Sequence, residues 1–70
     1  METTGKVLDA VRQYIVQYDA IPGIKEIAVA VGVSPAVVRR HVIVLQELGF
    51  VWLSRATGGI FPEGPEERGQ

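Results

Sequence analysis

The most constraining feature of the sequence is the junction Val31-Gly32-Val33-Ser34-Pro35, where the signals for one helix end and the next helix start almost touch. Glycine readily adopts the left-handed conformation that ends a helix. Serine caps a helix N-terminus through its hydroxyl, and proline suits the first helical position. Two helices joined by three or four residues with a glycine in the turn are typical of a helix-turn-helix. The junction therefore predicts two helices joined by a very tight turn.

Capping and breaking residues place the predicted helices along the chain. Thr3 or Thr4 can cap the first helix. Gly23 is an acceptable N-cap for the second, and Glu26 is spaced to reach back to the N–H of that cap. Gly49 closes the third. Apolar residues at helical spacing between these signals predict helices over residues 5–19, 24–31 and 35–48.

The residues after Gly49 predict a β-hairpin. Residues 50–54 (FVWLS) are β-branched and aromatic, residues 55–59 (RATGG) have turn composition, and residues 60–62 (IFP) return as a short strand. A hairpin this small is marginal alone and must pack on the helices. The predicted fold class is mainly α with a small β-hairpin, in the outline of a three-helix winged helix-turn-helix.

One domain and a tail account for the 70 residues. The pattern predicts a single domain over residues 1–61, because so short a chain supports one small core. Residues 62–70 (PEGPEERGQ) contain no core-forming residue, three acids and two prolines. This composition predicts an acidic, flexible C-terminal tail.

Helical projection predicts which side chains form the core. On the first helix the inward stripe combines aliphatic residues with a tyrosine, and Tyr14 is expected to pack beside it. On the third helix three aliphatic residues form the stripe, with His41 and Leu48 at its edge. The predicted core set is Val7, Leu8, Val11, Ile15 and Tyr18 from the first helix, Ile27, Ala28 and Val31 from the second, and Val38, Val42 and Leu45 from the third.

The charge distribution bears on nucleic-acid binding. The net charge of −1 counts against it, because proteins that neutralise phosphates usually carry a basic surface. However, Glu63, Glu66 and Glu67 belong to the predicted tail, where Arg68 alone offsets them. Residues 1–62 hold six Lys or Arg against five Asp or Glu. A binding face needs local rather than global positive charge.

Several functional classes find no support in the composition. The chain has no cysteine, which excludes disulfides and thiolate metal sites. His41 is the single histidine and has no evident partner ligand, so we expect a half-buried structural residue, no metal and no cofactor. The acids are scattered and no serine has an identifiable base, so we do not expect an enzyme. No apolar run approaches the ~20 residues that cross a bilayer, and the charged N-terminus is unlike a signal peptide. We expect a cytoplasmic prokaryotic protein with no membrane or small-molecule partner.

The stretch EIAVAVGVSPAVVRRHVIVLQELGFV resembles the winged-helix repressors and regulators of bacteria and archaea. The match is closest to the N-terminal DNA-binding domain of LexA-type repressors, and MarR- and ArsR-like regulators share the same frame. The resemblance implies double-stranded DNA as partner, with Arg55 on the wing. If DNA binds, Lys25 would contact phosphate. The protease domain of LexA is lacking, so self-cleavage is not implied. Positions that would face DNA are Ser34, Ala36, Val37, Arg39 and Arg40, and positions that would face the core are Val38, Val42, Leu45 and Leu48.

The sequence departs from this family along the second half of the predicted recognition helix. Ile43 and Val44 stand where such regulators commonly carry polar or basic residues. Trp52 points outward if Val51 and Leu53 point inward. These three outward residues are either tolerated scatter or a self-association surface, as in a homodimer. Two functions therefore remain open, a sequence-specific DNA-binding transcriptional regulator of repressor type and a winged-helix protein-interaction module that does not bind DNA.

Overall fold

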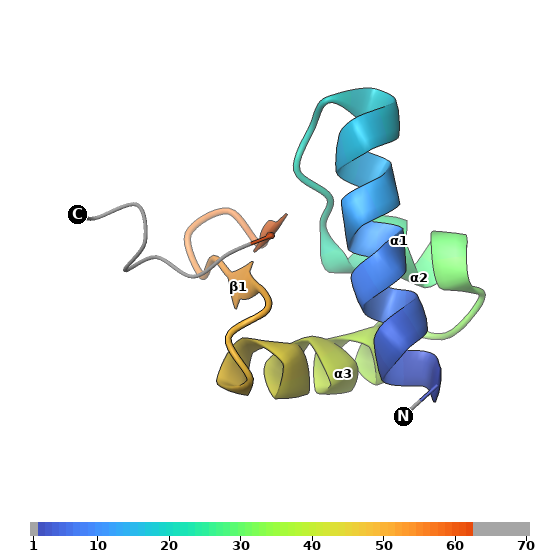
Figure 1. Ribbon diagram of the computed structural model, residues 1–70, viewed down its shortest axis with the longest axis vertical. Coiled ribbons are helices and arrows are strands. Elements are labelled where there is room, and N and C mark those ends of the chain that lie inside the picture. Colours follow the sequence, from blue (N-terminus) through green and yellow to red (C-terminus); the bar gives the residue numbers. More distant parts are fainter. Residues whose placement is uncertain (1, 63–70) are drawn as a thin grey trace.

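The computed structural model describes residues 2–62 and has three helices followed by a two-stranded antiparallel sheet (Figure 1). This arrangement confirms the predicted class of a mainly helical chain with a small hairpin. Residues 63–70 of the predicted acidic tail lie outside the described residues. The elements are α1 (Glu2–Tyr18), α2 (Ile24–Val31), α3 (Pro35–Glu47), β1 (Trp52–Leu53) and β2 (Ile60–Phe61).

The predicted caps set both ends of α2 and the start of α3. Glu26 Oε1 accepts a hydrogen bond from the Gly23 N–H at 2.9 Å. Gly32 is left-handed, with φ of 87°, and ends α2. Ser34 Oγ accepts from the Val37 N–H at 3.3 Å, directly before Pro35. These short-range bonds confirm the predicted boundaries because each depends only on residues within one turn.

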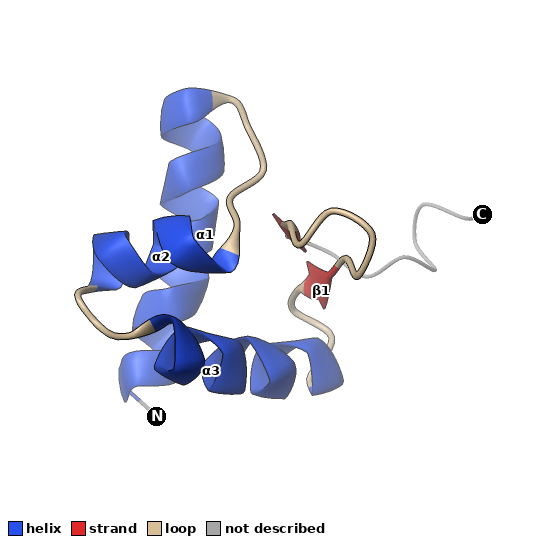
Figure 2. Ribbon diagram, turned by 180° about the vertical axis from the view of Figure 1, so that it is seen from behind, coloured by secondary structure: helices blue, strands red, loops and turns tan. Residues whose placement is uncertain are grey.

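The tight turn between α2 and α3 bends the two helix axes by 106° (Figure 2). Within residues 2–62 no single helix is long and apolar enough to cross a membrane. Only α2 and α3 taken together, across this bend, reach the required length and apolar character. After the bend α3 contacts both α1 and α2, and its buried stripe packs into the core that they share.

The start of α1 differs from the prediction. The helix already includes Glu2, so neither Thr3 nor Thr4 is its N-cap. Thr4 lies within the first turn and is buried, with 7% of its surface exposed. Its hydroxyl pairs with Nδ1 of His41 on α3 at 2.9 Å. A long-range contact therefore occupies the side chain that a local pattern assigned to capping.

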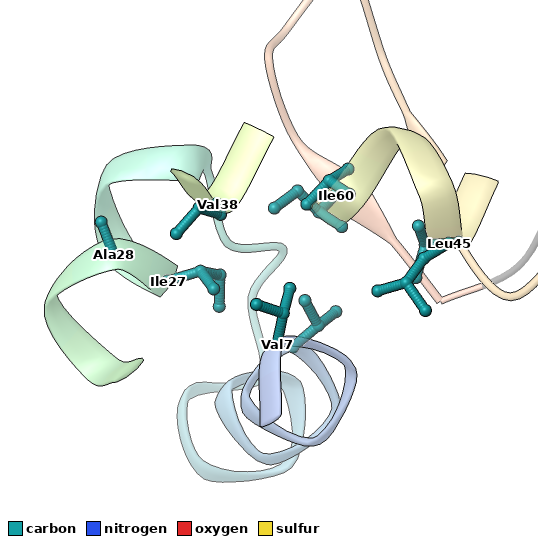
Figure 3. Packing of buried hydrophobic residues seen from close by; sticks show 9 residues of the cluster. Val7, Ile27, Ala28, Val38, Leu45 and Ile60 are labelled. Carbon is teal, nitrogen blue, oxygen red and sulfur yellow. The ribbon is translucent and has the colours of Figure 1, made fainter. Parts of the chain in front are cut away.

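All three helices and the hairpin contribute to one core (Figure 3). Leu8, Tyr14, Ile15 and Val31 are half-buried against it, as predicted. The hairpin and the chain that leads into it supply two further buried residues. The buried apolar residues are Val7 and Val11 from α1, Ile27 and Ala28 from α2, Val38, Val42 and Leu45 from α3, and Val51 and Ile60 from the hairpin.

Two predicted core positions are wrong. Tyr18 is 58% exposed at the last residue of α1, and its ring packs on that of Tyr14, with centroids 4.6 Å apart, rather than in the core. Leu48 is 63% exposed because α3 ends at Glu47 and the chain turns away at Gly49, which has φ of 88°. The helical stripe ends one turn early, and Val51 fills the core in its place.

The hairpin is joined to the helical part of the chain along the edge of β2 that faces away from β1. Trp52 pairs with Phe61 and Leu53 with Ile60. On the other side of β2, the Ile60 N–H donates to the Pro22 carbonyl at 2.8 Å, and Gly23 bridges to Gly59. The segment between α1 and α2 therefore lies against β2 as a short additional edge. This contact fixes the hairpin to the helices, as expected for a sheet too small to be stable alone.

Candidate nucleic-acid interface

The face of α3 opposite the core carries the predicted DNA-facing residues. Val38 and Val42 are fully buried, whereas Ala36, Arg39 and Arg40 are exposed. Successive side chains are turned by about 100° around a helix. Because the valines face the core, both arginine side chains lie on the solvent side of α3. Val37 is half-buried and lies at the border of this face. The structure thus brings together a small residue and two arginines on one accessible helical surface.

The N-terminal end of α3 adds a favourable electrostatic environment. Ser34 is exposed, and its hydroxyl oxygen accepts one of the free backbone N–H groups of the first turn. The first turn contains no acidic residue. The partial positive charge of the helix N-terminus is therefore not offset locally, and it adds to the two arginine charges that follow.

Lys25 lies next to this helix end. It is exposed on the first turn of α2 and, together with Ser34 and Pro35, lines a shallow hollow between α2 and the start of α3. The turn between the two helices folds the start of α3 back beside α2, so that these residues line the same hollow. Lys25, Arg39 and Arg40 accordingly provide positive charge on two successive helices.

Arg55 lies on a different element. It is exposed at the turn of the hairpin, which follows the C-terminal end of α3 rather than its arginine-bearing start (Figure 1). The turn is held by the Gly58 N–H donating to the Ser54 carbonyl at 2.8 Å and by the Thr57 N–H donating to Ser54 Oγ at 3.3 Å. A ligand that contacts both Arg55 and the α3 arginines must extend along the molecule.

The predicted self-association residues do not form the exposed set that was expected. Ile43 is 44% exposed, but Val44 and Trp52 are half-buried. The Trp52 ring packs on Phe61, directly across the sheet, with ring centroids 5.6 Å apart. Leu48 and Phe50, either side of the turn at Gly49, are also exposed, although the sequence interpretation did not place them on an association surface; Val16 and Val29 are more exposed still, at 85% and 84%.

Two polar side chains, Gln46 and Thr4, make long-range contacts that the sequence interpretation did not predict. Gln46 Oε1 accepts a hydrogen bond from the Leu53 N–H at 2.9 Å and so joins α3 to β1. Thr4 joins α1 to α3 through His41. No local signal could identify either residue, because each partner is set by tertiary packing. The half-buried state expected of His41 is confirmed.

Within residues 2–62, no three His, Cys, Asp or Glu side chains come together as metal ligands. Nδ1 of His41 faces Thr4 rather than another ligating group. The described surface carries exposed cations at Lys25, Arg39, Arg40 and Arg55, and exposed acids at Asp9, Asp19, Glu26 and Glu47. A scan against protein-family models and searches of curated proteins and of solved structures found no match for the chain.

Proposed function

We propose that this chain is a winged helix-turn-helix domain that binds double-stranded DNA in a sequence-specific manner and acts as a repressor-like transcriptional regulator. In this proposal α3 enters the major groove and the hairpin, as the wing, contacts the flanking backbone. The observation that carries the proposal is the division of α3 into a buried stripe and an exposed face bearing Ala36, Arg39 and Arg40.

The relation between α2 and α3 supports this reading. Their axes are bent by 106° at a tight turn, within the range of about 90–120° typical of helix-turn-helix units. In such units the second helix presents its N-terminal residues to base edges. The exposed arginines of α3 lie in its first two turns, and Ala36 allows a close approach to the groove floor. Arginine can bind guanine O6 and N7 together, which discriminates by about 1–3 kcal/mol.

The positions of the other cations fit the same model of binding. Lys25, beside the N-terminus of α3, would meet the phosphate backbone at one edge of the groove. Arg55 would meet it from the wing, farther along the duplex. A single short helix gives limited affinity, so binding as a homodimer to symmetric half-sites is part of the proposal. The expected cellular location is the cytoplasm of a prokaryote.

Titration on duplex DNA at several salt concentrations tests the proposal. The ligand is the duplex that the full chain enriches from a random pool. Each phosphate contact should contribute about 0.9 to the slope of log affinity against log salt. Arg39→Ala and Arg40→Ala should each weaken binding, by about fivefold to a hundredfold where the arginine reads a base. Arg12→Ala removes an exposed arginine of α1 and serves as the matched control.

The titrations distinguish binding through α3 from non-specific charge attraction and from no binding. Loss of affinity in the two α3 variants, with unchanged circular dichroism and an unaffected Arg12→Ala protein, supports DNA binding through α3. Absence of binding at low salt contradicts the proposal. Equal effects of Arg12→Ala and Arg40→Ala would show non-specific charge attraction instead of a defined interface.

A second candidate is a protein-interaction module that does not bind DNA. The exposed apolar residues Ile43, Leu48 and Phe50, close together in the chain at the end of α3, favour it, because a partner that covered them would bury apolar surface. Sedimentation equilibrium of Ile43→Glu and Leu48→Glu proteins addresses the self-associating form of this candidate. A wild-type dimer that both changes dissociate would support it, whereas a monomeric mass for all three proteins would count against it.

A further inference from the structure

The hydrogen bond between Gln46 and Leu53 occupies a particular place in the fold. Gln46 lies in the last turn of α3, and its side-chain oxygen accepts from the Leu53 N–H at 2.9 Å. Its backbone carbonyl accepts from the Gly49 N–H at 3.0 Å. One residue therefore holds both the turn that leaves α3 and the strand that begins the hairpin.

The ladder explains why the Leu53 N–H is available to Gln46. Leu53 and Ile60 lie directly opposite each other, and each N–H points away from the partner strand. The Ile60 N–H donates to the Pro22 carbonyl on one side, and the Leu53 N–H donates to Gln46 on the other. Without Gln46 the Leu53 N–H would be the open donor of a sheet edge.

The two edges of the hairpin are thus joined to different parts of the molecule. The β2 edge is joined to the segment between α1 and α2, through Pro22 and Gly23. The β1 edge is joined to α3 through Gln46. The Gln46 bond is a directional link from β1 to the helix that carries Arg39 and Arg40. The apolar contacts of Leu53 and Ile60 anchor the sheet, but they are not directional as a hydrogen bond is.

We infer that Gln46 is a positioning residue for DNA recognition, which fixes the wing relative to α3 so that Arg55 and the α3 arginines contact one duplex together. The inference rests on the proposed function and deepens it. Two contacts on one ligand reinforce each other only when the geometry permits both at once. Without the Gln46 bond β2 stays joined to Pro22, but β1 loses its directional link to α3, which weakens the contribution of Arg55 and leaves that of the α3 arginines in place.

The test is a double-mutant cycle in the full chain, measured on the enriched duplex. Gln46→Met keeps the length and helix propensity of the side chain and removes the acceptor. Gln46→Glu keeps an acceptor oxygen at the same distance and is the rescue variant. Gln17→Met, at an exposed glutamine of α1, is the matched control. Each is combined with Arg55→Ala and, separately, with Arg40→Ala. The effect of an arginine is compared within each background, so any direct effect on DNA of the carboxylate introduced by Gln46→Glu cancels.

In the wild-type background Arg55→Ala should weaken binding about fivefold and lower the salt slope by about 1. In the Gln46→Met background the same change should weaken binding less than about twofold and leave the slope unchanged. Arg40→Ala should have the same effect in both backgrounds. Arg55→Ala should weaken binding as much in the Gln46→Glu and Gln17→Met backgrounds as it does in the wild type. Hydrogen exchange of the Leu53 amide, followed by NMR without DNA, should be faster in Gln46→Met alone.

Each remaining outcome overturns a defined statement. An Arg55 effect of equal size in Gln46→Met and wild type, on a duplex that both bind, overturns the positioning role and leaves DNA binding intact. If Arg55→Ala does not weaken binding even in the wild-type background, the positioning role is likewise overturned and DNA binding is left intact. Failure of the wild type to bind any duplex overturns the proposed function, and the positioning role with it. Unchanged Leu53 exchange in Gln46→Met shows that the bond does not hold the hairpin.

Discussion

The hydroxyl of Thr4 lies 2.9 Å from Nδ1 of His41 and joins the first turn of α1 to the middle of α3. Thr4 is buried and His41 is half-buried, so neither group is fully compensated by water when the bond is lost. The contact fixes how α3 crosses α1, and therefore how the exposed face of α3 is presented.

Replacing Thr4 with valine tests this link, because valine has the same shape and no hydroxyl. Thr4→Val should lower the free energy of unfolding by about 1 kcal/mol, the usual net value of one hydrogen bond. Urea denaturation followed by circular dichroism measures the change. Thr3→Val, at the neighbouring half-buried position, is the control and should stay within about 0.5 kcal/mol of wild type. Equal changes for the two variants would remove any special role for Thr4.

The cap of α3 gives a second prediction. Ser34→Ala removes the oxygen that accepts from the Val37 N–H and should destabilise the protein by about 1 kcal/mol. Ser34→Gly should cost only a few tenths of a kcal/mol, because water reaches the freed N–H more easily. The comparison uses thermal and urea unfolding of both variants. A glycine variant as unstable as the alanine variant would contradict the capping role.

Two glycines with empty space around them should respond to alanine in opposite directions. A Cβ added at Gly5 or at Gly49 meets no atom within 4 Å, so steric contact decides neither case. Gly5 is inside α1, and Gly5→Ala should stabilise by about 0.5–1 kcal/mol. Gly49 has φ of 88°, and Gly49→Ala should cost about 1–2 kcal/mol. Unfolding midpoints that move in the same direction would show that backbone conformation is not the deciding factor.

Leu45, in the last turn of α3, and Leu48, the C-cap residue that follows this helix, should differ sharply in their contributions to stability. Leu45 is 2% exposed, and Leu45→Ala should cost about 2–5 kcal/mol by opening a cavity. Leu48 is 63% exposed, and Leu48→Ala should change stability by less than about 0.5 kcal/mol. Urea unfolding of both proteins checks this. A large loss of stability in Leu48→Ala would show that Leu48 packs in the core, as helical periodicity alone predicts.

The ends of α2 and the start of α3 could be predicted from sequence because cap chemistry is local. Gly32, Ser34 and Pro35 act on backbone groups within a turn of themselves, and the structure shows the predicted α2 boundaries without change. The fold class followed from these helix boundaries together with the composition of residues 50–62. The start of α1 could not be predicted, since its one distinctive residue, Thr4, is paired with a residue far along the chain.

The candidate interface was also predictable in part, where the exposure of a side chain depends on local helical geometry. The exposure of Arg39 and Arg40 follows from helical phase relative to Val38 and Val42, and the structure confirms it. Leu48 was misplaced because periodicity assumes a neighbour along the whole helix, whereas the chain turns at Gly49. Gln46 gave no signal at all, because its role depends on where β1 lies.

The bond between the Ile60 N–H and the Pro22 carbonyl has a consequence for how the chain assembles. Helices form from contacts within a few residues, but this bond requires the chain to return from residue 60 to residue 22, which costs conformational entropy that the helices do not incur. Ile60, at 0% exposure, completes the core only after that return. We therefore expect the hairpin to dock last during folding, and a chain cut after Gly49 to be less stable because it lacks the core residues Val51 and Ile60.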